Sequence, residues 1–354
     1  MINVIGPVNT LGYGYTTLNV LDRLYPSVAY FPIGQPDVST QRDYNLVRQT
    51  IANAHIFDQD APCLRIWHQH DMAQFVGRGL RVGFPIFELD DFSDLEKHHL
   101  TSVDRLFVCS NWAKQVVENA IDVPDGFVRV VPLGVDTSIF KPAPVQPKST
   151  TIFFNCGKWE YRKGHDILAK AFGAAFTPSD DVELWLMCDN PFLKREQTEE
   201  WKSHYRHNRI GHKVRFIERV STHEEVYNIM SKVDCGVFPA RAEGWNLELL
   251  ELMATGKQVI TTNCTAHTEF CTSDNARLID VKDKEAAKDG VWFDGTKGAW
   301  AKFNMDTQHD LVANMRAIHE EKQVGRLMIN KAGVETARHF TWDNTAKEIL
   351  RNVR

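Results

Sequence analysis

A short loop near the middle of the chain concentrates positive charge. It reads Gly157-Lys158-Trp159-Glu160-Tyr161-Arg162-Lys163-Gly164 and lies between a predicted strand and a predicted helix. Three cations, Lys158, Arg162 and Lys163, at a helix start form a local positive well that suits a diphosphate. A solvated loop would also tolerate lysines. Gly164 and the helix start add backbone N–H donors that a random basic loop would lack.

Two glutamates occur further along the chain with seven residues between them. Asn246 can cap a helix that ends at Gly256, which places Glu243 in the loop before the helix and Glu251 on its body. Most other positions of this helix are apolar and are expected to be buried. Glu251 therefore either pairs with a polar ligand or caps a neighbouring element.

Polar side chains also follow two predicted strands of the first half, Cys63–His68 and Arg81–Phe87. His68 and His70 share a face and could bind a metal, but no further ligands with metal-site spacing accompany them. A neutral His70 that bonds a substrate hydroxyl is the preferred interpretation, with an ordinary polar strand end as the alternative. Glu88 is either an acidic site residue or part of a solvated loop.

Two glycines, Gly12 and Gly14, follow the first predicted strand. They let the backbone approach a ligand closely, and a helix that starts near Tyr15 would present N–H groups to an anion. The dinucleotide fingerprint G-x-G-x-x-G fails because Thr17 stands at its last glycine. The chain also lacks the phosphate loop G-x-x-x-x-G-K-[ST], which argues against a kinase or ATPase.

Short β-branched and aromatic runs alternate with amphipathic stretches in both halves of the chain, which predicts an α/β protein with two doubly wound, Rossmann-like domains. A proline-rich connector, residues 142–148, separates them. We expect an N-terminal domain over 1–145 and a C-terminal domain over 150–340, facing each other across a cleft. The predicted strands are 2–5, 27–31, 63–68, 81–87, 106–109, 128–131, 151–155, 183–188, 213–217, 235–238 and 258–261. The predicted helices include 16–24, 113–119, 165–176, 222–232, 246–255 and 310–319.

The composition is that of an ordinary globular protein. The 354 residues carry a formal charge of −5 and are 43% hydrophobic and 25% charged, which excludes disorder and collagen. No apolar run is long enough to span a bilayer, and the first residues lack the pattern of a signal peptide. Seven cysteines without a C-x-x-C pair indicate thiols rather than disulfides or zinc ligands. We therefore expect a cytoplasmic protein, of a cell or of an infected host.

The chain resembles a known family in several motifs that follow one another in order. The stretch from Glu243 to Glu251 resembles the E-x7-E motif of retaining GT-B glycosyltransferases of family 4. Four further segments resemble other motifs of that family, in chain order: its S-x-W segment, its P-x-G-V-D…F-x-P passage, its G-R…K-G phosphate loop, and the F-[ST]-W that starts its last helix. They are residues 110–114, 131–142, 157–164 and 340–342.

The resemblance implies roles for these residues. Lys163 and Lys158 would neutralise the donor diphosphate, together with Arg162, and Lys158 stands where the family usually has Arg. Glu251 would accept hydrogen bonds from the ribose hydroxyls. Glu243, with the backbone of the next residues, would hold the transferred sugar and the β-phosphate. The donor-binding set also includes Gly12, Gly14, Gly244, Trp245, Asn246 and Leu247.

The predicted activity is the retaining transfer of a sugar from a nucleoside-diphosphate sugar to a hydroxyl acceptor. The catalytic candidates are Glu243, His70 and Glu88, and either of the last two could approach the sugar. No metal or other cofactor is expected, because fixed cations and helix N-termini can stabilise the leaving group. The partners are the donor and a carbohydrate or other hydroxyl acceptor, without integral membrane association.

Two alternatives stay open at this point. The run from Trp67 to Asp71 resembles a passage in phage DNA α-glucosyltransferases, and Arg78 and Arg81 lie nearby, so DNA with hydroxymethylated bases is a possible acceptor. The other alternative is a non-catalytic module that only binds a nucleotide sugar.

Overall fold

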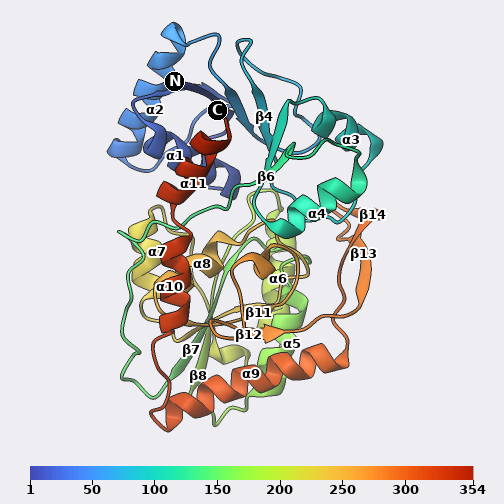
Figure 1. Cartoon of the computed structure of the whole chain (residues 1–354). Helices are drawn as coiled ribbons and strands as arrows, with labels where there is room; N and C mark the ends of the chain where they lie inside the picture. Colours follow the sequence, from blue (N-terminus) through green and yellow to red (C-terminus); the bar gives the residue numbers. More distant parts are fainter. Residues whose placement is uncertain (354) are drawn as a thin grey trace. The chain divides into compact units, whose positions relative to one another are not determined.

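The computed structural model describes residues 1–353 and divides the chain into two compact units. Unit 1 is Met1–Val135 together with the segment that starts at Phe340, and unit 2 is Asp136–His339. Figure 1 shows that each unit contains its own sheet with helices packed around it.

Unit 1 is built on a six-stranded sheet of order β2-β1-β3-β4-β5-β6, and all its strand pairs are parallel. The order runs outward from β1 in both directions, so right-handed crossovers place helices on both faces. The core contains Phe87, Phe92, Leu106 and Val117. The strands are β1 (Ile2–Gly6), β2 (Val28–Pro32), β3 (Cys63–Ile66), β4 (Arg81–Phe84), β5 (Arg105–Val108) and β6 (Val128–Val130).

Five helices and a short 3₁₀ turn complete unit 1. Several begin at a side-chain cap, as at Ser110, whose Oγ accepts from the Ala113 N–H. The last helix returns to this unit: Thr345 Oγ1 donates to the Pro132 carbonyl (2.8 Å), and Trp342 packs edge-on to Tyr15. These elements are α1 (Gly12–Leu24), α2 (Gln41–Asn53), η1 (Ala54–Ile56), α3 (Asp94–Thr101), α4 (Asn111–Ala120) and α11 (Trp342–Asn352).

Unit 2 repeats the plan with a six-stranded sheet of order β12-β11-β10-β7-β8-β9, again with parallel pairs. Phe153, Phe172, Leu184 and Met315 lie in its core. A separate antiparallel hairpin joins β13 (Lys284–Lys288) to β14 (Asp294–Ala301). The sheet strands are β7 (Thr151–Gly157), β8 (Val182–Cys188), β9 (Val214–Phe216), β10 (Cys235–Phe238), β11 (Gln258–Thr262) and β12 (Arg277–Ile279). The helices are α5 (His165–Ala175), α6 (Arg195–Arg206), η2 (Gly211–Lys213), α7 (His223–Met230), α8 (Leu247–Ala254), η3 (Thr265–Glu269), α9 (Met305–Gln323) and α10 (Lys331–His339).

The fold class expected from the sequence is confirmed, with two corrections in detail. Helix α1 starts at Gly12 rather than near Tyr15, so both glycines lie in its first turn. The proline-rich segment 142–148 belongs to unit 2, because the Ala143 N–H donates to the Thr255 carbonyl and Lys257 Nζ donates to the Pro144 carbonyl.

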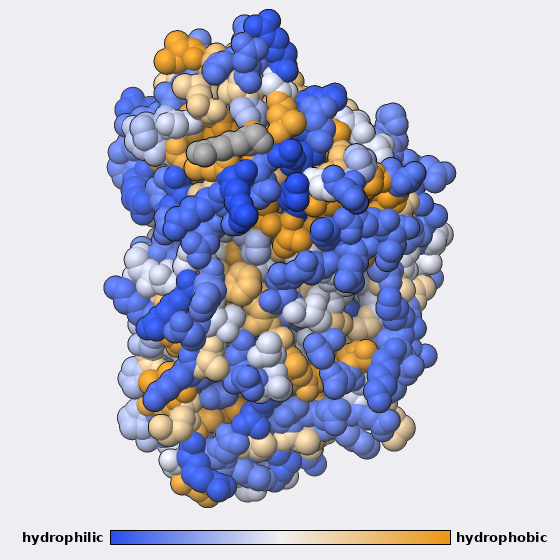
Figure 2. Space-filling view, in the orientation of Figure 1, coloured by the Kyte–Doolittle hydropathy of each residue, from blue (hydrophilic) through white to orange (hydrophobic). Residues whose placement is uncertain are grey.

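The face seen in Figure 2 is mostly hydrophilic, with apolar areas between the hydrophilic residues. Within residues 1–353, no helix combines the length and apolar character needed to cross a membrane. The seven cysteines are free thiols, five of them buried and Cys156 and Cys264 half-buried.

Candidate functional site

The basic loop between β7 and α5 is held in a fixed shape by buried neighbours. His165 Nε2 donates to the Lys158 carbonyl (2.9 Å), and Asn190 Nδ2 donates to the Trp159 carbonyl (3.0 Å). Burial lowers the pKa of His165 to about 4, so the ring is neutral near pH 7. Gly164 caps α5 with φ 73°, and a Cβ there would lie 2.0 Å from the Pro239 carbonyl oxygen. Only glycine allows the loop to approach the segment after β10 this closely.

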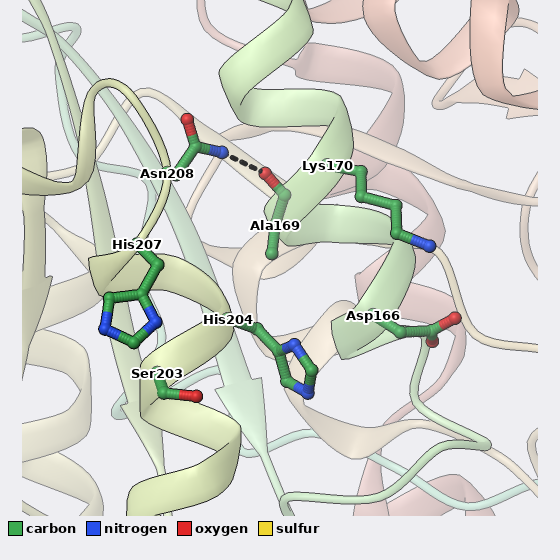
Figure 3. Close-up of a pocket in the computed structure, with 7 residues that line it drawn as sticks. All are labelled: Asp166, Ala169, Lys170, Ser203, His204, His207 and Asn208. Carbon is green, nitrogen blue, oxygen red and sulfur yellow. Dashed lines mark hydrogen bonds between the residues drawn. The ribbon is translucent and has the colours of Figure 1, made fainter.

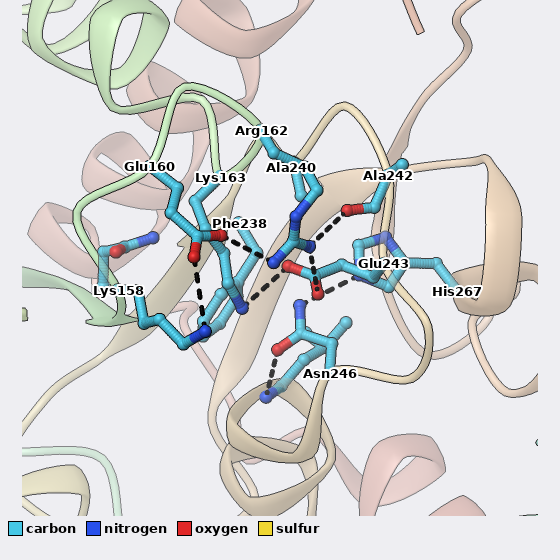
Figure 4. A network of polar contacts seen from close by, with 12 residues as sticks. Lys158, Glu160, Arg162, Lys163, Phe238, Ala240, Ala242, Glu243, Asn246 and His267 are labelled. Atoms are coloured by element: carbon cyan, nitrogen blue, oxygen red, sulfur yellow. Dashed lines mark hydrogen bonds and ion pairs between the residues drawn. The ribbon is translucent and has the colours of Figure 1, made fainter. Parts of the chain in front are cut away.

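A buried network of charges joins this loop to Glu243 (Figure 4). Lys163 Nζ lies 2.8 Å from Glu243 Oε1, and Arg162 Nη1 lies 2.9 Å from Oε2. Arg162 Nη2 donates to Glu160 Oε2 (2.7 Å), whose other oxygen lies 3.3 Å from Lys158 Nζ. The sequence-predicted cations and Glu243 therefore meet, with Glu160 as an additional member.

Each carboxylate of this network is ionised because the cations outweigh the cost of burial. Burial alone would raise the pKa of Glu243, but Lys163 and then Arg162 lower it to about 2. Burial lowers the pKa of Lys163, but the carboxylates of Glu243 and Glu248 raise it above its usual value. Burial opposes the charge of Glu160 as well, yet Arg162, Lys158 and Lys163 leave its pKa below the usual value. The network is thus a fixed set of charges at neutral pH.

The three cations differ in how accessible they are. Arg162 is 5% exposed; its guanidinium bonds to the carboxylates of Glu243 and Glu160 and donates one further hydrogen bond to the Ala242 carbonyl. Lys163 is 12% exposed at its side chain, and Lys158, at 36%, is the most open. This geometry favours Lys158 and Lys163 as direct ligands of an anion and Arg162 as the residue that holds Glu243.

The segment after Glu243 leads directly into α8. Gly244, Trp245 and Asn246 are buried, and Leu247 begins the helix. Asn246 has φ 83° and caps the helix through Oδ1, which accepts from the Leu249 N–H (3.2 Å). Because the first N–H groups of a helix lack intrahelical acceptors, this turn can bind an anion. The expected cap at Asn246 is confirmed, and its left-handed backbone is an addition.

Glu251 lies on the body of α8 and is 4% exposed. Its Oε1 is 3.6 Å from His223 Nδ1, which is too long for a strong hydrogen bond. Burial, and then the nearby carboxylate of Glu248, raises the pKa of Glu251 well above its usual value. Because the contact with His223 offsets little of the cost of burying this carboxyl group, the group is suited to accept hydrogen bonds from a ligand.

The candidates of unit 1 lie at the carboxyl edge of its sheet. His70 is exposed in the turn after β3 and stacks on His68 with 5.3 Å between ring centroids, while Glu88 is half-buried after β4. Tyr13, in the first turn of α1, has its ring 4.7 Å from His68, and its hydroxyl donates to the Ile86 carbonyl (2.7 Å) and accepts from the Ile86 N–H (2.9 Å). Tyr13 thus connects the first turn of α1 to the segments after β3 and β4.

Gly12 and Gly14 have different surroundings. A Cβ at Gly14 would lie 2.3 Å from the Asn9 backbone nitrogen, so this glycine is required by packing. A Cβ at Gly12 would meet nothing within 4 Å, and Gly12 is exposed. Of the two, Gly12 is the one where a ligand could come close to the backbone.

Arg241 is a member of the site that the sequence reasoning did not identify. It is 2% exposed; its two Nη atoms lie 2.8 and 3.0 Å from the carboxylate oxygens of Asp166, and its Nε donates to Glu285 on β13 (2.8 Å). Its guanidinium also lies 3.6 Å from the centre of the Tyr161 ring. Arg241 therefore connects the basic loop, the Glu243 segment and the β13–β14 hairpin. Its position two residues before Glu243, in the segment that follows a predicted strand, is the signal that could have marked it.

A separate cavity of about 310 Å³ lies between α5 and the end of α6 (Figure 3). It is lined by Asp166, Lys170, Ser203, His204 and other polar residues. None of the site residues predicted from the sequence lines it. Among residues 1–353, no group of three or more His, Cys, Asp or Glu side chains is arranged to hold a metal, and the expectation that none is required stays a prediction.

The comparisons with known proteins agree with this geometry. Residues 150–292 match the family model described as Glycosyl transferases group 1. The matched region lies within unit 2 and is similar to that family. The match includes the basic loop and the segment from Glu243 to Glu251.

A curated relative is the phosphatidylinositol N-acetylglucosaminyltransferase GPI3 subunit of Saccharomyces cerevisiae, which is 24% identical over 200 residues, or 52% of this chain. The match spans 43% of the length of that relative.

Solved structures resemble the whole chain. The sucrose-phosphate synthase of Thermosynechococcus elongatus has a TM-score of 0.72 at 16% identity, covering 99% of this chain and 97% of its own. HepE of Anabaena in complex with UDP and glucose has a TM-score of 0.71 at 14% identity, covering 99% and 98%. These likenesses confirm the GT-B fold expected from the sequence.

Proposed function

We propose that this protein is a glycosyltransferase that moves a sugar from a nucleoside-diphosphate sugar to a hydroxyl acceptor with retention of the anomeric configuration. The observation that carries the proposal is the buried contact between Lys163 and Glu243, which joins the basic loop to the N-terminus of α8. The similarity to a structure that contains UDP and glucose supports UDP as the first nucleotide to test.

The leaving diphosphate would bind to Lys158 and Lys163. The ammonium group of Lys163 has three N–H donors, and Glu243 engages its nitrogen from one side at 2.8 Å, so donors remain for a phosphate oxygen. Lys158 adds a more exposed charge, and the first turn of α8 adds backbone donors. Because the cations are already oriented, charge that develops on the diphosphate is stabilised without further reorganisation.

Glu251 would accept hydrogen bonds from the ribose hydroxyls. Its carboxyl group is buried, its Oε1 lies 3.6 Å from His223 Nδ1, and its pKa is raised. The hydroxyls of a bound ribose would supply donors and lower that pKa on binding.

The ionisation of Glu243 bears on how configuration is retained. Both of its oxygens face cations and its pKa is about 2, so the carboxylate is weakly basic and a poor nucleophile. We therefore favour attack by the acceptor on the same face as the leaving diphosphate over a covalent intermediate on Glu243. His70 or Glu88 is the residue that we propose to contact the transferred sugar.

The acceptor is proposed to be a carbohydrate or another molecule with a free hydroxyl. The arginines that suggested DNA are paired within unit 1: Arg78 lies 2.6 Å from Asp60 and Arg81 lies 2.8 Å from Asp104. Nothing in the described residues favours a DNA acceptor over a carbohydrate.

A nucleotide screen tests the proposal. Thermal stability is measured with UDP, GDP, ADP and TDP, and a ligand at 100 times its Kd should stabilise the protein by about 2.7 kcal/mol. Release of the nucleoside diphosphate from matching nucleotide sugars is then measured with and without an acceptor panel. Stabilisation without turnover on any acceptor would favour a non-catalytic binding module, and no stabilisation by any nucleotide would contradict the proposal.

A further inference from the structure

The residue that starts α8 has an unusual backbone conformation. Asn246 has φ 83° and ψ 76°, which lie in the left-handed region that residues other than glycine rarely adopt. Its Oδ1 accepts from the Leu249 N–H (3.2 Å), and its Nδ2 lies 2.9 Å from His267 Nε2 (Figure 4). Both ends of the side-chain amide are therefore used.

The protonation of His267 follows from its other partners. Its Nδ1 lies 3.0 Å from the Thr262 carbonyl oxygen, which can only accept, and 3.0 Å from Thr261 Oγ1, whose own hydrogen is donated to the Phe238 carbonyl (3.1 Å). Both partners therefore accept, and Nδ1 carries the hydrogen. The Nε2 atom must then accept from Asn246. His267 is fully buried, and burial lowers its pKa to about 4, which agrees with a neutral ring. A directed chain of hydrogen bonds thus runs from Leu249 through Asn246 and His267 to the end of β11.

The short helix η3, which contains His267, also contacts Glu243 at the other end of the segment that leads to Asn246. Thr265, at φ 51°, accepts from the Glu243 N–H through Oγ1 (3.0 Å), and the Ala266 N–H donates to the Glu243 carbonyl (3.2 Å). Within residues 1–353, Asn246 and Thr265 are the two non-glycine residues with positive φ. Strained residues persist only where neighbours hold them, and they cluster at functional sites.

We propose that His267 is a positioning residue: by accepting from Asn246 it holds the left-handed cap, and so sets the direction of the Glu243 segment and the first turn of α8 toward the donor. This inference rests on the proposed function, because that segment is the one proposed to bind the diphosphate. His267 itself touches no substrate in this account.

The backbone part of the proposal is tested with two variants of Asn246. N246G and N246A both remove the side-chain amide, but only glycine adopts a left-handed conformation without steric cost. We expect N246A to have a Kd for UDP, measured by calorimetry, at least fivefold higher than N246G. Equal Kd values would show that the left-handed backbone is not needed for binding and would overturn the proposal.

The role of His267 is tested with H267L, which keeps a similar volume but removes the acceptor. We expect H267L to raise the Kd for UDP at least tenfold in the wild-type background and less than threefold in the N246G background. The same factor in both backgrounds would mean that His267 only fills space. H267Q, whose amide oxygen can accept from Asn246, should retain binding, and it serves as the soluble variant if H267L does not fold.

A stability measurement separates this inference from the proposed function. The four proteins of the H267L and N246G cycle are unfolded in urea, and the two substitutions should be non-additive. H319L is the matched control: His319 is also buried and bonds Thr151 Oγ1 (2.8 Å), away from α8, so its effect should be additive with N246G. If the wild-type protein binds no UDP, the proposed function fails, but the stability cycle still tests whether His267 positions Asn246. Additive effects of H267L and N246G on stability would refute this positioning role.

Discussion

The ion pairs of Glu243 lead to a quantitative prediction about stability. The pKa of Glu243 is about 2 in the folded chain against an ordinary value of 4.5. A difference of about 2.5 pKa units, at about 1.4 kcal/mol per unit, corresponds to about 3 kcal/mol of folding free energy at neutral pH. E243Q removes this contribution and leaves the buried cations Lys163 and Arg162 uncompensated, so it should destabilise unit 2 by about that amount.

The pH dependence makes the prediction specific. Because the folded pKa is depressed, the stabilisation is complete above about pH 4.5 and is lost as the pH falls toward 2. The difference between wild type and E243Q in urea unfolding, followed by tryptophan fluorescence, should therefore fall from about 3 kcal/mol at pH 7 to about 1.5 kcal/mol at pH 3.

A matched variant controls for the substitution itself. Glu199 is an exposed carboxylate of unit 2 that pairs with Lys202 and Arg206, and E199Q should leave the urea midpoint close to that of wild type at every pH. The reasoning would be refuted if wild type and E243Q had the same free energy of unfolding at pH 7. It would also be refuted if the difference between them did not change between pH 7 and pH 3.

Three further predictions follow from single contacts. K163A should lower kcat/KM at least tenfold, about 1.4 kcal/mol, whereas the control K202A on the surface of α6 should not. Equal kcat/KM values for K163A and K202A would contradict the role of Lys163. G14A should lower the Tm, because its Cβ would clash with Asn9. G12A should fold normally, and it should raise KM if a substrate approaches the backbone at this position. A G14A variant with the wild-type Tm would contradict the packing argument. UDP affinity should rise with pH as Glu251 ionises, since its pKa is raised, and E251Q should abolish that rise; parallel profiles in calorimetry would count against a ribose contact.

The sheets and the two loops of the candidate site could be predicted because their signals are local. Each strand of the main sheets except β12 appears as a short run of apolar or β-branched residues, and β10 has the expected bounds, Cys235–Phe238. The cap at Asn246 and the end of α8 before Gly256 follow from residue type alone.

Other elements carry little local signal. Helix α2 buries only Leu46, Val47 and Thr50, and its remaining positions are mostly polar. Strand β13 reads Lys-Glu-Ala-Ala-Lys, which is a helix-like composition. It nevertheless pairs with β14 in a hairpin, and Glu285 also bonds to the distant Arg241; such tertiary contacts override propensity.

Within the site, the sequence indicated which residues meet but not how they share their charges. Arg162 and Lys163 are adjacent in the basic loop, yet the fold encloses one between carboxylates and leaves the other partly accessible. His267 has no predicted role, because its partner Asn246 comes from a segment that only the folded chain brings next to it. Glu160 pairs with Lys158 and Arg162 of its own loop, and its part in the network depends on how the fold distributes these charges.

A structure of the protein with a bound nucleoside-diphosphate sugar tests the central claim most directly. We predict that the diphosphate lies within hydrogen-bond distance of Lys158 Nζ, Lys163 Nζ and the first turn of α8, with the ribose hydroxyls on Glu251. A donor bound elsewhere, or a diphosphate that contacts neither lysine, would contradict the account.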